Sequence, residues 1–428
     1  MPTPLGVYIS IPFCKAKCTF CNFASGAFAP SRMQRYVDRL CDEIEAADST
    51  ALSLGAGRVP AGAERNILDT LFFGGGTPSL LSSLHVRKIF KTLRAEFSFK
   101  KSAEITLECA PGQLSDETLA ELLQQGMNRI SLGVQSFVDG ESAAVGRLHS
   151  QQSVLDELAR LRAAGLQDIN VDLIVGLPHQ TRASWEHSLD AVIATGVPHV
   201  SVYMLEVDDE SRLGREMLAE GTRYGAAAVP SEDDAADWYQ LGCERLNAAG
   251  IHQYEISNFA SEGHQSRHNL KYWRRNPYLG FGLDAHSMLL TPTGAVRFSN
   301  TSDLDLYSAD SEAAEDPASA QNPLALYPQD PAVQSLPAPE VDYVNLEQAF
   351  EESLFLGLRL NEGVSLASLR DQFGEALLDQ IQPALEEVHE VGLLSLSRGD
   401  DMDRIALTDR GRMVSNEVFS RLLLPTPA

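Results

Sequence analysis

The sequence predicts an α/β protein with a parallel sheet, open or curled into a partial barrel, and a small C-terminal α+β domain that resembles a winged helix. Three observations carry this prediction. Through the first 260 residues, apolar runs alternate with amphipathic helical stretches in six consecutive β-then-α units. The apolar runs are nearly continuous, which is typical of strands covered by helices on both faces. After about residue 300 the alternation stops.

Polar residues gather at one end of the predicted strands. We expect strands at 6–12, 68–76, 104–109, 129–136, 169–176 and 199–206, and helices near 31–48, 81–97, 115–125, 151–164, 183–195 and 233–249. Such folds build their sites at the C-terminal ends of the strands. The residues at these ends are Gly74–Thr77, Glu108, Gln135, Asp172 and Glu206.

The chain is strongly acidic. Its 428 residues include 34 Lys plus Arg against 59 Asp plus Glu, a formal net charge of −25. This charge argues against a general binder of nucleic acids or anionic membranes. No apolar stretch of about 18 residues occurs, so no transmembrane helix is expected. The first 18 residues lack the features of a secretory signal, which predicts a cytoplasmic protein that meets membranes only through partners.

The last third of the chain has a different organisation. Residues 301–340 contain six prolines and eight acidic residues without a Lys or Arg, which predicts a solvated linker or long loop. Helices are expected at 345–360, near 365–373 and 378–390, and over 409–423, with short strands at 392–397 and 404–408. Because this unit carries no basic stripe, we expect a structural or partner-facing lid rather than a DNA-binding module.

Three of the six cysteines lie within eight residues, directly after the first predicted strand. Cys14, Cys18 and Cys21 have the C-x3-C-x2-C spacing that can hold three irons of a cubane iron–sulfur cluster and leave the fourth iron open. A zinc site is the weaker interpretation, since structural zinc takes four ligands and no fourth Cys or His is nearby. Three buried structural cysteines are the plainest alternative. Scattered Cys41, Cys109 and Cys243 do not suggest disulfides.

The cysteine loop, the six βα units and the turn Gly74-Gly75-Gly76-Thr77-Pro78 together resemble the radical S-adenosylmethionine (SAM) superfamily. The resemblance implies a partial (β/α)6 barrel, one [4Fe–4S] cluster held by the three cysteines, and SAM chelated to the fourth iron. It also implies SAM contacts from matching positions. These are Tyr8, Phe20, Gly75, Gly76, Thr77, Glu108, Gln135, Arg147, Asp172 and Met204.

Within that superfamily, the chain resembles the anaerobic coproporphyrinogen III oxidase-like family, and two features favour its haem chaperone subgroup, HemW. The oxidases usually carry a further cysteine two residues past the third cluster cysteine, where this chain has Phe23. The chaperones are marked by His-Asn-x-x-Tyr-Trp, which occurs here at 268–273. The resemblance implies haem-binding residues His268, Asn269, Tyr272 and Trp273.

The residues around this motif suit a porphyrin. His268 is a candidate ligand for haem iron beside aromatic side chains that can stack on the ring. Arg267, Lys271, Arg274 and Arg275 form a local run of positive charge that suits two propionates. The plainer alternative is that the aromatics are core residues and the arginines a solvated face. His286 and Met204 are secondary candidates for ligation or for lining the cavity.

The resemblance therefore implies a haem chaperone that carries a [4Fe–4S] cluster and SAM, and delivers haem to apo-haemoproteins, including membrane-bound respiratory proteins. Cleavage of SAM would require an electron donor. The alternative function is that of an oxygen-independent coproporphyrinogen III dehydrogenase. A radical enzyme for another substrate is the third possible function. The predicted organisation is a radical SAM barrel (1–260), a haem-motif segment packed on it (261–300), the linker (301–340) and a C-terminal domain (341–428).

Overall fold

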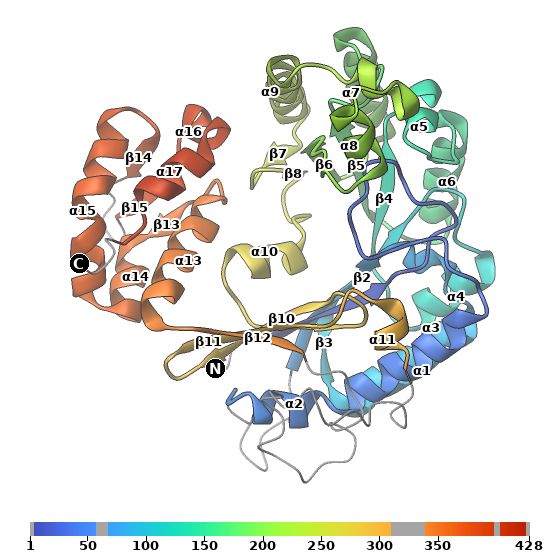
Figure 1. Cartoon of the computed structure of the whole chain (residues 1–428), viewed down its shortest axis with the longest axis horizontal. Helices are drawn as coiled ribbons and strands as arrows, with labels where there is room; N and C mark the ends of the chain where they lie inside the picture. The colour runs from blue at the N-terminus through green and yellow to red at the C-terminus, as the bar shows by residue number, and fades with distance from the viewer. Residues whose placement is uncertain (1–3, 57–66, 310–338, 398–402, 425–428) are drawn as a thin grey trace.

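The computed structural model describes residues 4–56, 67–309, 339–397 and 403–424. Twelve strands of these residues form one curved sheet in the order β12-β11-β10-β9-β1-β2-β3-β4-β5-β6-β8-β7 (Figure 1). The six strands from β1 to β6 pair side by side in parallel, which confirms the predicted α/β class and partial barrel. They are β1 Leu5–Ile11, β2 Ile67–Gly75, β3 Ser98–Cys109, β4 Arg129–Gln135, β5 Asp168–Val175 and β6 His199–Met204.

Helices return the chain from the end of each strand to the start of the next. Six of them begin at a hydroxyl residue whose side chain accepts the backbone N–H three residues on: Ser82, Ser115, Ser150, Thr181, Ser211 and Ser231. Such N-caps satisfy a donor that the helix itself leaves unpaired. The helices of the barrel are α1 Arg32–Glu45, α2 Ala47–Ser53, α3 Ser83–Glu96, α4 Asp116–Gln124, α5 Asp139–Ala144, α6 Gln151–Ala163, α7 Arg182–Thr195, α8 Arg212–Leu218 and α9 Glu232–Ala248, with short 3₁₀ segments at Pro78–Leu80 and Arg223–Ala228.

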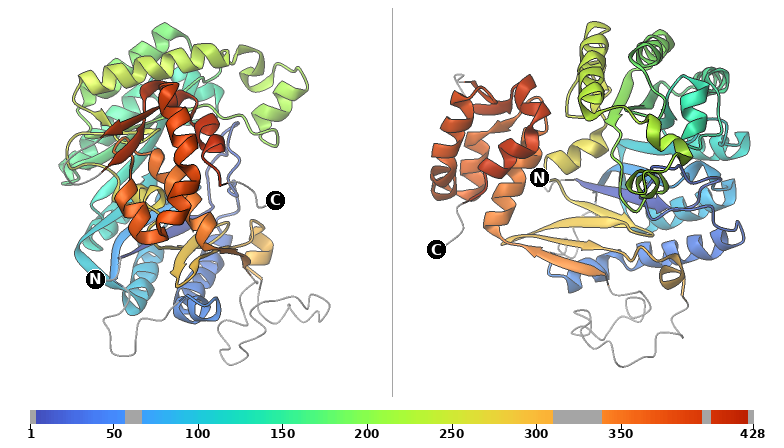
Figure 2. Two further views of the ribbon diagram at one scale, coloured as in Figure 1. Left: turned by 90° about the vertical axis from the view of Figure 1, so that its left-hand side faces the viewer. Right: turned by 45° about the horizontal axis from the view of Figure 1, so that its top comes forward.

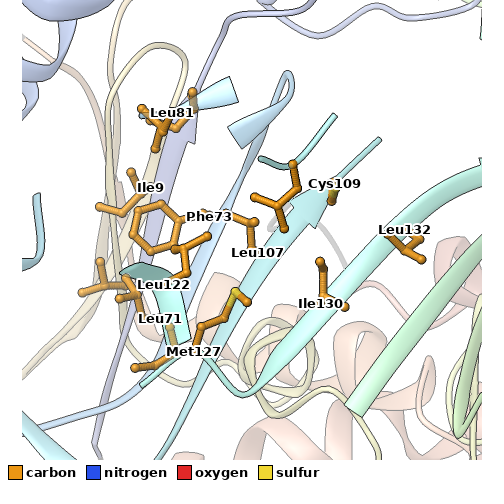
Figure 3. Packing of buried hydrophobic residues seen from close by; sticks show 14 of the residues in the cluster. Ile9, Leu71, Phe73, Leu81, Leu107, Cys109, Leu122, Met127, Ile130 and Leu132 are labelled. Carbon is orange, nitrogen blue, oxygen red and sulfur yellow. The ribbon is translucent and has the colours of Figure 1, made fainter. Parts of the chain in front are cut away.

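The two faces of the parallel strands differ. Apolar residues of β1 to β4 face the helices, where Phe73 and Leu107 lie with Leu122 and Met127 (Figure 3). At the alternate positions, the strands carry small polar residues that are buried inside the barrel, namely Thr70, Thr106, Ser131, Asn170 and Ser201. The strands therefore alternate, which corrects the expectation of nearly continuous apolar runs covered by helices on both faces: only the helix-facing side is an apolar core.

Residues 261–300 extend the sheet as well as packing on the barrel. Strand β9 (Tyr278–Phe281) pairs in parallel with β1, and β10 (His286–Thr291) and β11 (Gly294–Ser299) continue it with antiparallel neighbours. Before them come β7 (His252–Gln253), β8 (Asn258–Ala260) and helix α10 (Arg267–Trp273), which lies between β2 and the C-terminal domain (Figure 1).

Most of the predicted linker, residues 310–338, lies outside the described residues. The part that precedes it includes helix α11 (Leu304–Tyr307), in which Leu304 and Tyr307 join the barrel core. The part that follows it enters β12 (Glu340–Val344), which pairs with β11. Strands β10 to β12 form a ribbon that runs from the barrel toward the C-terminal domain (Figure 2).

The C-terminal domain has its own apolar core of helices around a three-stranded sheet in the order β13-β15-β14. The predicted last helix, 409–423, is two helices, because the backbone leaves the helical region at Val414. No helix in the described part of the chain is long and apolar enough to cross a membrane. The elements are α13 Leu346–Leu358, β13 Val364–Ser365, α14 Leu366–Phe373, α15 Glu375–Glu390, β14 Leu394–Ser397, β15 Arg404–Leu407, α16 Asp409–Met413 and α17 Ser415–Arg421.

An ion pair joins this domain to the segment after α10. Arg275 Nε lies 2.8 Å from Glu352 Oε2 of α13, and the two side chains are only 5% and 10% exposed. The neighbouring pair, Arg274 with Glu362, is 3.0 Å long but 47% and 50% exposed. The first pair is therefore buried in the junction, and the second is solvated.

Removing one partner of the buried pair should destabilise the protein far more than removing one partner of the solvated pair. We expect Glu352→Ala to cost about 3–5 kcal/mol, because it leaves the Arg275 guanidinium buried without a counter-charge. Glu362→Ala is the matched control and should cost less than about 1 kcal/mol. Urea unfolding of both variants measures this, and equal losses of stability would contradict a buried pair.

Candidate functional site

The cysteine loop is tied to the glycine turn by backbone hydrogen bonds. Gly76 N–H donates to the Ile11 carbonyl at 2.9 Å, and Thr77 N–H donates to the Phe13 carbonyl at 2.8 Å. At the other end of the loop, Cys14 N–H donates to the Gly26 carbonyl at 2.9 Å. Strands β1 and β2 end together in register, so the loop after one and the turn after the other lie side by side.

The three cysteines of this loop are free and half-buried. Burial raises the pKa of the Cys14 thiol, and the Thr77 and Ser25 hydroxyls hydrogen-bond to it and lower it in part. Arg147 Nη1 donates to Cys18 Sγ at 3.4 Å, which stabilises a thiolate there. These hydrogen-bond donors suit thiolates bound to iron.

Among the described residues, no three His, Cys, Asp or Glu side chains converge on a single metal ion. A mononuclear site such as structural zinc needs that convergence. A cubane does not, because each thiolate binds a different iron. The arrangement of the loop fits a cluster better than a single ion.

The glycine turn has the backbone geometry that its composition predicts. Gly75 has a φ of +100°, in the region that favours glycine. A Cβ at Gly76 would lie 2.9 Å from the carbonyl oxygens of Ile11 and Phe13. At Gly74 it would lie 2.8 Å from Tyr8 Oη. Side chains are excluded here because the neighbouring backbone and ring already occupy the space.

The carboxyl group of Glu108 lies beside this turn, and that of Asp172 lies near it inside the barrel. Burial and the nearby charge of Asp172 raise the pKa of Glu108 to about 8, although the Gly75 N–H hydrogen-bonds to it. Burial also raises the pKa of Asp172, which accepts hydrogen bonds from Ser131 at 2.9 Å and Asn170 at 2.7 Å. A cationic ligand at this position would stabilise the ionised carboxylates.

The neighbouring polar side chains have unused hydrogen-bonding atoms. Gln135 Oε1 and Arg147 Nε are buried and have no partner in the described part of the chain. Gln135 also has a φ of 70°, which is uncommon for a residue other than glycine and marks strain at functional sites. Buried groups of this kind are normally satisfied. Since Arg147 also donates to Cys18 Sγ, these unsatisfied atoms beside the cysteine loop suit a polar ligand.

The remaining residues of the predicted SAM set take different positions. Tyr8 lies between the turn and the barrel interior, where it stacks on Phe72. Phe20 packs on a small apolar cluster with Val145 and Leu177. Met204 ends β6 and is partly exposed. The structure thus brings Tyr8, the glycine turn, Glu108, Arg147 and Asp172 together around the barrel mouth, with Phe20 and Met204 at its rim.

The histidine of the 268–273 motif is buried and fully hydrogen-bonded. His268 Nδ1 shares a hydrogen bond of 2.9 Å with the Thr70 hydroxyl, and Nε2 shares one of 2.8 Å with the Tyr272 hydroxyl. Its ring stacks on Phe72 at 5.2 Å. Burial lowers the pKa of His268 to about 3. The imidazole is therefore neutral.

The structure corrects the expectation of a positive patch around α10. Each of its four cations is already paired, so the segment offers no free charge for propionates. Arg274 and Arg275 bind glutamates of the C-terminal domain, and Lys271 and Arg267 bind acidic residues of β2 and β3. The partners are Glu362, Glu352, Asp69 and Glu104. The sequence could not show this, because all four partners are distant along the chain.

The other motif residues lie on both sides of α10. Asn269 faces the barrel interior, and Tyr272 meets Tyr278 edge to face at 4.7 Å. Trp273 lies under the Arg359 guanidinium at 5.4 Å, toward the C-terminal domain. The interpretation of the aromatics as packing residues therefore describes Trp273 better than Tyr272.

Two cavities meet at Tyr8 and Tyr272. The inner one, about 200 Å³, lies inside the barrel and is lined mainly by polar groups that sequence reasoning did not name, such as Ser131, Asn170 and Ser201. In the sequence, this polar lining is indicated by the polar residues that recur at every second position of the strands. The outer cavity, about 310 Å³, lies beside the cysteine loop. It is lined by Tyr8, Ser10, Pro12, Phe23, Ala24, Ser25, Gly75, Tyr272, Tyr278, Leu283, Asp284 and His286.

Comparison with known proteins agrees with this arrangement. Residues 8–192 match the radical SAM superfamily and residues 344–414 the HemN C-terminal domain. The heme chaperone HemW of Bacillus subtilis is 31% identical over 417 residues, covering 97% of this chain and 98% of that protein. That of Mycobacterium tuberculosis H37Rv is 31% identical, covering 98% and 95%. The coproporphyrinogen III oxidase of Escherichia coli shares the fold, with a TM-score of 0.75 at 22% identity over 99% of this chain and 90% of that one.

Replacing a cluster cysteine should remove the iron without unfolding the barrel. We expect Cys14→Ser, Cys18→Ser and Cys21→Ser each to lose the visible absorbance and most of the iron of anaerobically reconstituted protein, because one corner of the cubane loses its ligand. Cys243→Ser, which changes a cysteine of α9, is the control. Iron at the wild-type level in all three variants would contradict the ligand assignment.

Glu108→Gln should change the pH dependence of stability. A carboxyl with a raised pKa contributes stability below its unfolded value, 4.5, and loses it as pH rises through about 8. Between about pH 5 and 8.5, ligand-free wild type should therefore lose stability relative to the variant. Each pKa unit corresponds to about 1.4 kcal/mol, so the loss is on the order of a few kcal/mol. Urea unfolding at both pH values tests this, and parallel curves would refute it.

Proposed function

The chain belongs to the HemW family of the radical SAM superfamily, and we propose that it is a haem chaperone: it binds haem and passes it to haem-free acceptor proteins. The observation that carries this proposal is the likeness to proteins named heme chaperone HemW along nearly the full length of both chains. An aromatic-lined cavity beside the cysteine loop supports it, because it offers a porphyrin an apolar surface next to a polar site.

The proposed resident cofactors are one [4Fe–4S] cluster and SAM. Cys14, Cys18 and Cys21 would hold the cluster, and when bound the two groups supply reductive cleavage of the sulfonium C–S bond. The chain itself contributes thiolate stabilisation by Arg147, and a turn at Gly75–Thr77 whose backbone a ligand can approach closely.

The residues around the turn would orient SAM. Glu108 and Asp172 suit its amino group or ribose hydroxyls, since both are half-buried carboxyls with raised pKa values that gain from a positive or hydrogen-bonding partner. The unpaired atoms of Gln135 and Arg147 support a polar ligand at the same place. Tyr8, Phe20 and Met204 complete the proposed set as apolar surface around it.

We propose that His268, Asn269, Tyr272 and Trp273 belong to the haem-binding region. Tyr272 supports this most directly, because its ring forms part of the wall of the outer cavity. His268 holds the Tyr272 hydroxyl from the inner side. Trp273 and Arg359 link the same helix to the C-terminal domain.

The proposed partners are haem, apo-haemoproteins and an electron donor, and the proposed place of action is the cytoplasm. Free thiols that bind a reduced cluster need a reducing compartment. Delivery to membrane-bound respiratory proteins would then take place through contact with those proteins.

A haem-transfer assay with reconstituted protein tests the proposed function. We expect haem titration to give a saturable Soret band, and the haem-loaded protein to restore an apo-haemoprotein faster than free haem at the same concentration does. A parallel incubation with reductant, SAM and coproporphyrinogen III should give no protoporphyrinogen. Steady formation of protoporphyrinogen would instead establish the dehydrogenase activity. Absence of haem binding would overturn the proposal that the protein is a haem chaperone.

A further inference from the structure

We infer that His286, at the start of β10, is the side chain that ligates the haem iron, with the porphyrin seated in the outer cavity beside the cysteine loop. This inference rests on the proposed function. It goes beyond it because it assigns the ligand to a residue outside the 268–273 motif.

The outer cavity is larger than the inner one and has the lining that a flat aromatic ligand needs. Its volume, about 310 Å³, lies at the lower end of the usual range for ligand pockets, about 300–1,000 Å³, whereas the inner cavity of about 200 Å³ lies below it. Aromatic rings form much of its wall, and the ring of Phe23 is 63% exposed. Aromatic faces stack on a porphyrin, so an exposed ring here gains from being covered.

His286 is the imidazole available in this cavity. Its side chain is exposed and lines the cavity, and no hydrogen bond to its ring occurs among the described residues. The Asp284 carboxylate lies close enough for its charge to act on the imidazole.

The motif histidine is less suited to the same role. Both ring nitrogens of His268 already have hydrogen-bond partners, and its side chain faces the smaller inner cavity. Ligation through Nε2 would break the bond to Tyr272 and leave a buried hydroxyl unpaired. His268 is therefore a positioning residue for Tyr272, whose ring forms part of the wall of the outer cavity.

The backbone that leads to His286 is held rigidly by α1. Gly282 N–H donates to Glu43 Oε2 at 2.9 Å, and Leu283 N–H donates to Tyr36 Oη at 2.9 Å. Asn300 Nδ2 donates to Glu43 Oε1 at 2.6 Å, which fixes the facing end of β11. Because this strand end is fixed, the backbone at His286 loses little conformational entropy when the imidazole binds iron.

Haem titration of cluster-loaded variants tests this inference. We expect His286→Ala to weaken haem binding about tenfold or more and to change the Soret band, with free imidazole in the buffer restoring the wild-type spectrum. His286→Met should keep binding with a different Soret position, because a thioether replaces the imidazole. Iron content and SAM binding should stay at the wild-type level in both variants.

Two further histidine variants serve as comparisons. His252→Ala, an exposed histidine at the opposite edge of the sheet, should bind haem as the wild type does. His268→Ala should weaken binding without loss of the histidine-ligated spectrum. Wild-type affinity and spectrum in His286→Ala would overturn the inference alone, whereas a wild-type chain that binds no haem would overturn the proposed function.

Discussion

The site depends on one constraint: the loop after β1 and the turn after β2 must lie against each other without side chains between them. Backbone hydrogen bonds from Gly76 and Thr77 to the carbonyls of Ile11 and Phe13 meet this constraint, and glycine is required because a Cβ would collide with the same carbonyls. The parallel register of the two strands fixes where the loop begins. The cysteines, the cavity beside them and the buried carboxyls are all placed relative to this junction.

The interior of the barrel adds an electrostatic requirement. Glu108 and Asp172 lie half-buried near each other, and the charge of Asp172 raises the free-energy cost of ionising Glu108. Unpaired atoms of Gln135 and Arg147 lie at the same end of the sheet. The side chains of the site do not satisfy one another, and a ligand that carries both a cation and hydrogen-bonding groups would stabilise them. SAM has both.

The fold class could be predicted from the sequence because six apolar runs and the helices between them leave a periodic signal. The cysteine spacing likewise points to a cluster without any structure. The polar lining of the barrel was harder to foresee, although Ser131, Asn170 and Ser201 stand at alternate positions of their strands, because each is a single polar residue between apolar neighbours. The pairing of Arg275 with Glu352, and the saturation of His268 by Thr70 and Tyr272, depend on contacts between distant segments. Sequence spacing carries no information about such contacts.

The central claim is that three cysteines leave one iron of a cubane open to SAM. Mössbauer spectra of anaerobically reconstituted protein, recorded before and after addition of SAM, test it most directly. The account predicts one [4Fe–4S] cluster per chain, with a single iron site whose isomer shift and quadrupole splitting change when SAM is added. A protein without such a cluster would contradict it, and so would one in which no iron site changes its isomer shift or quadrupole splitting when SAM is added.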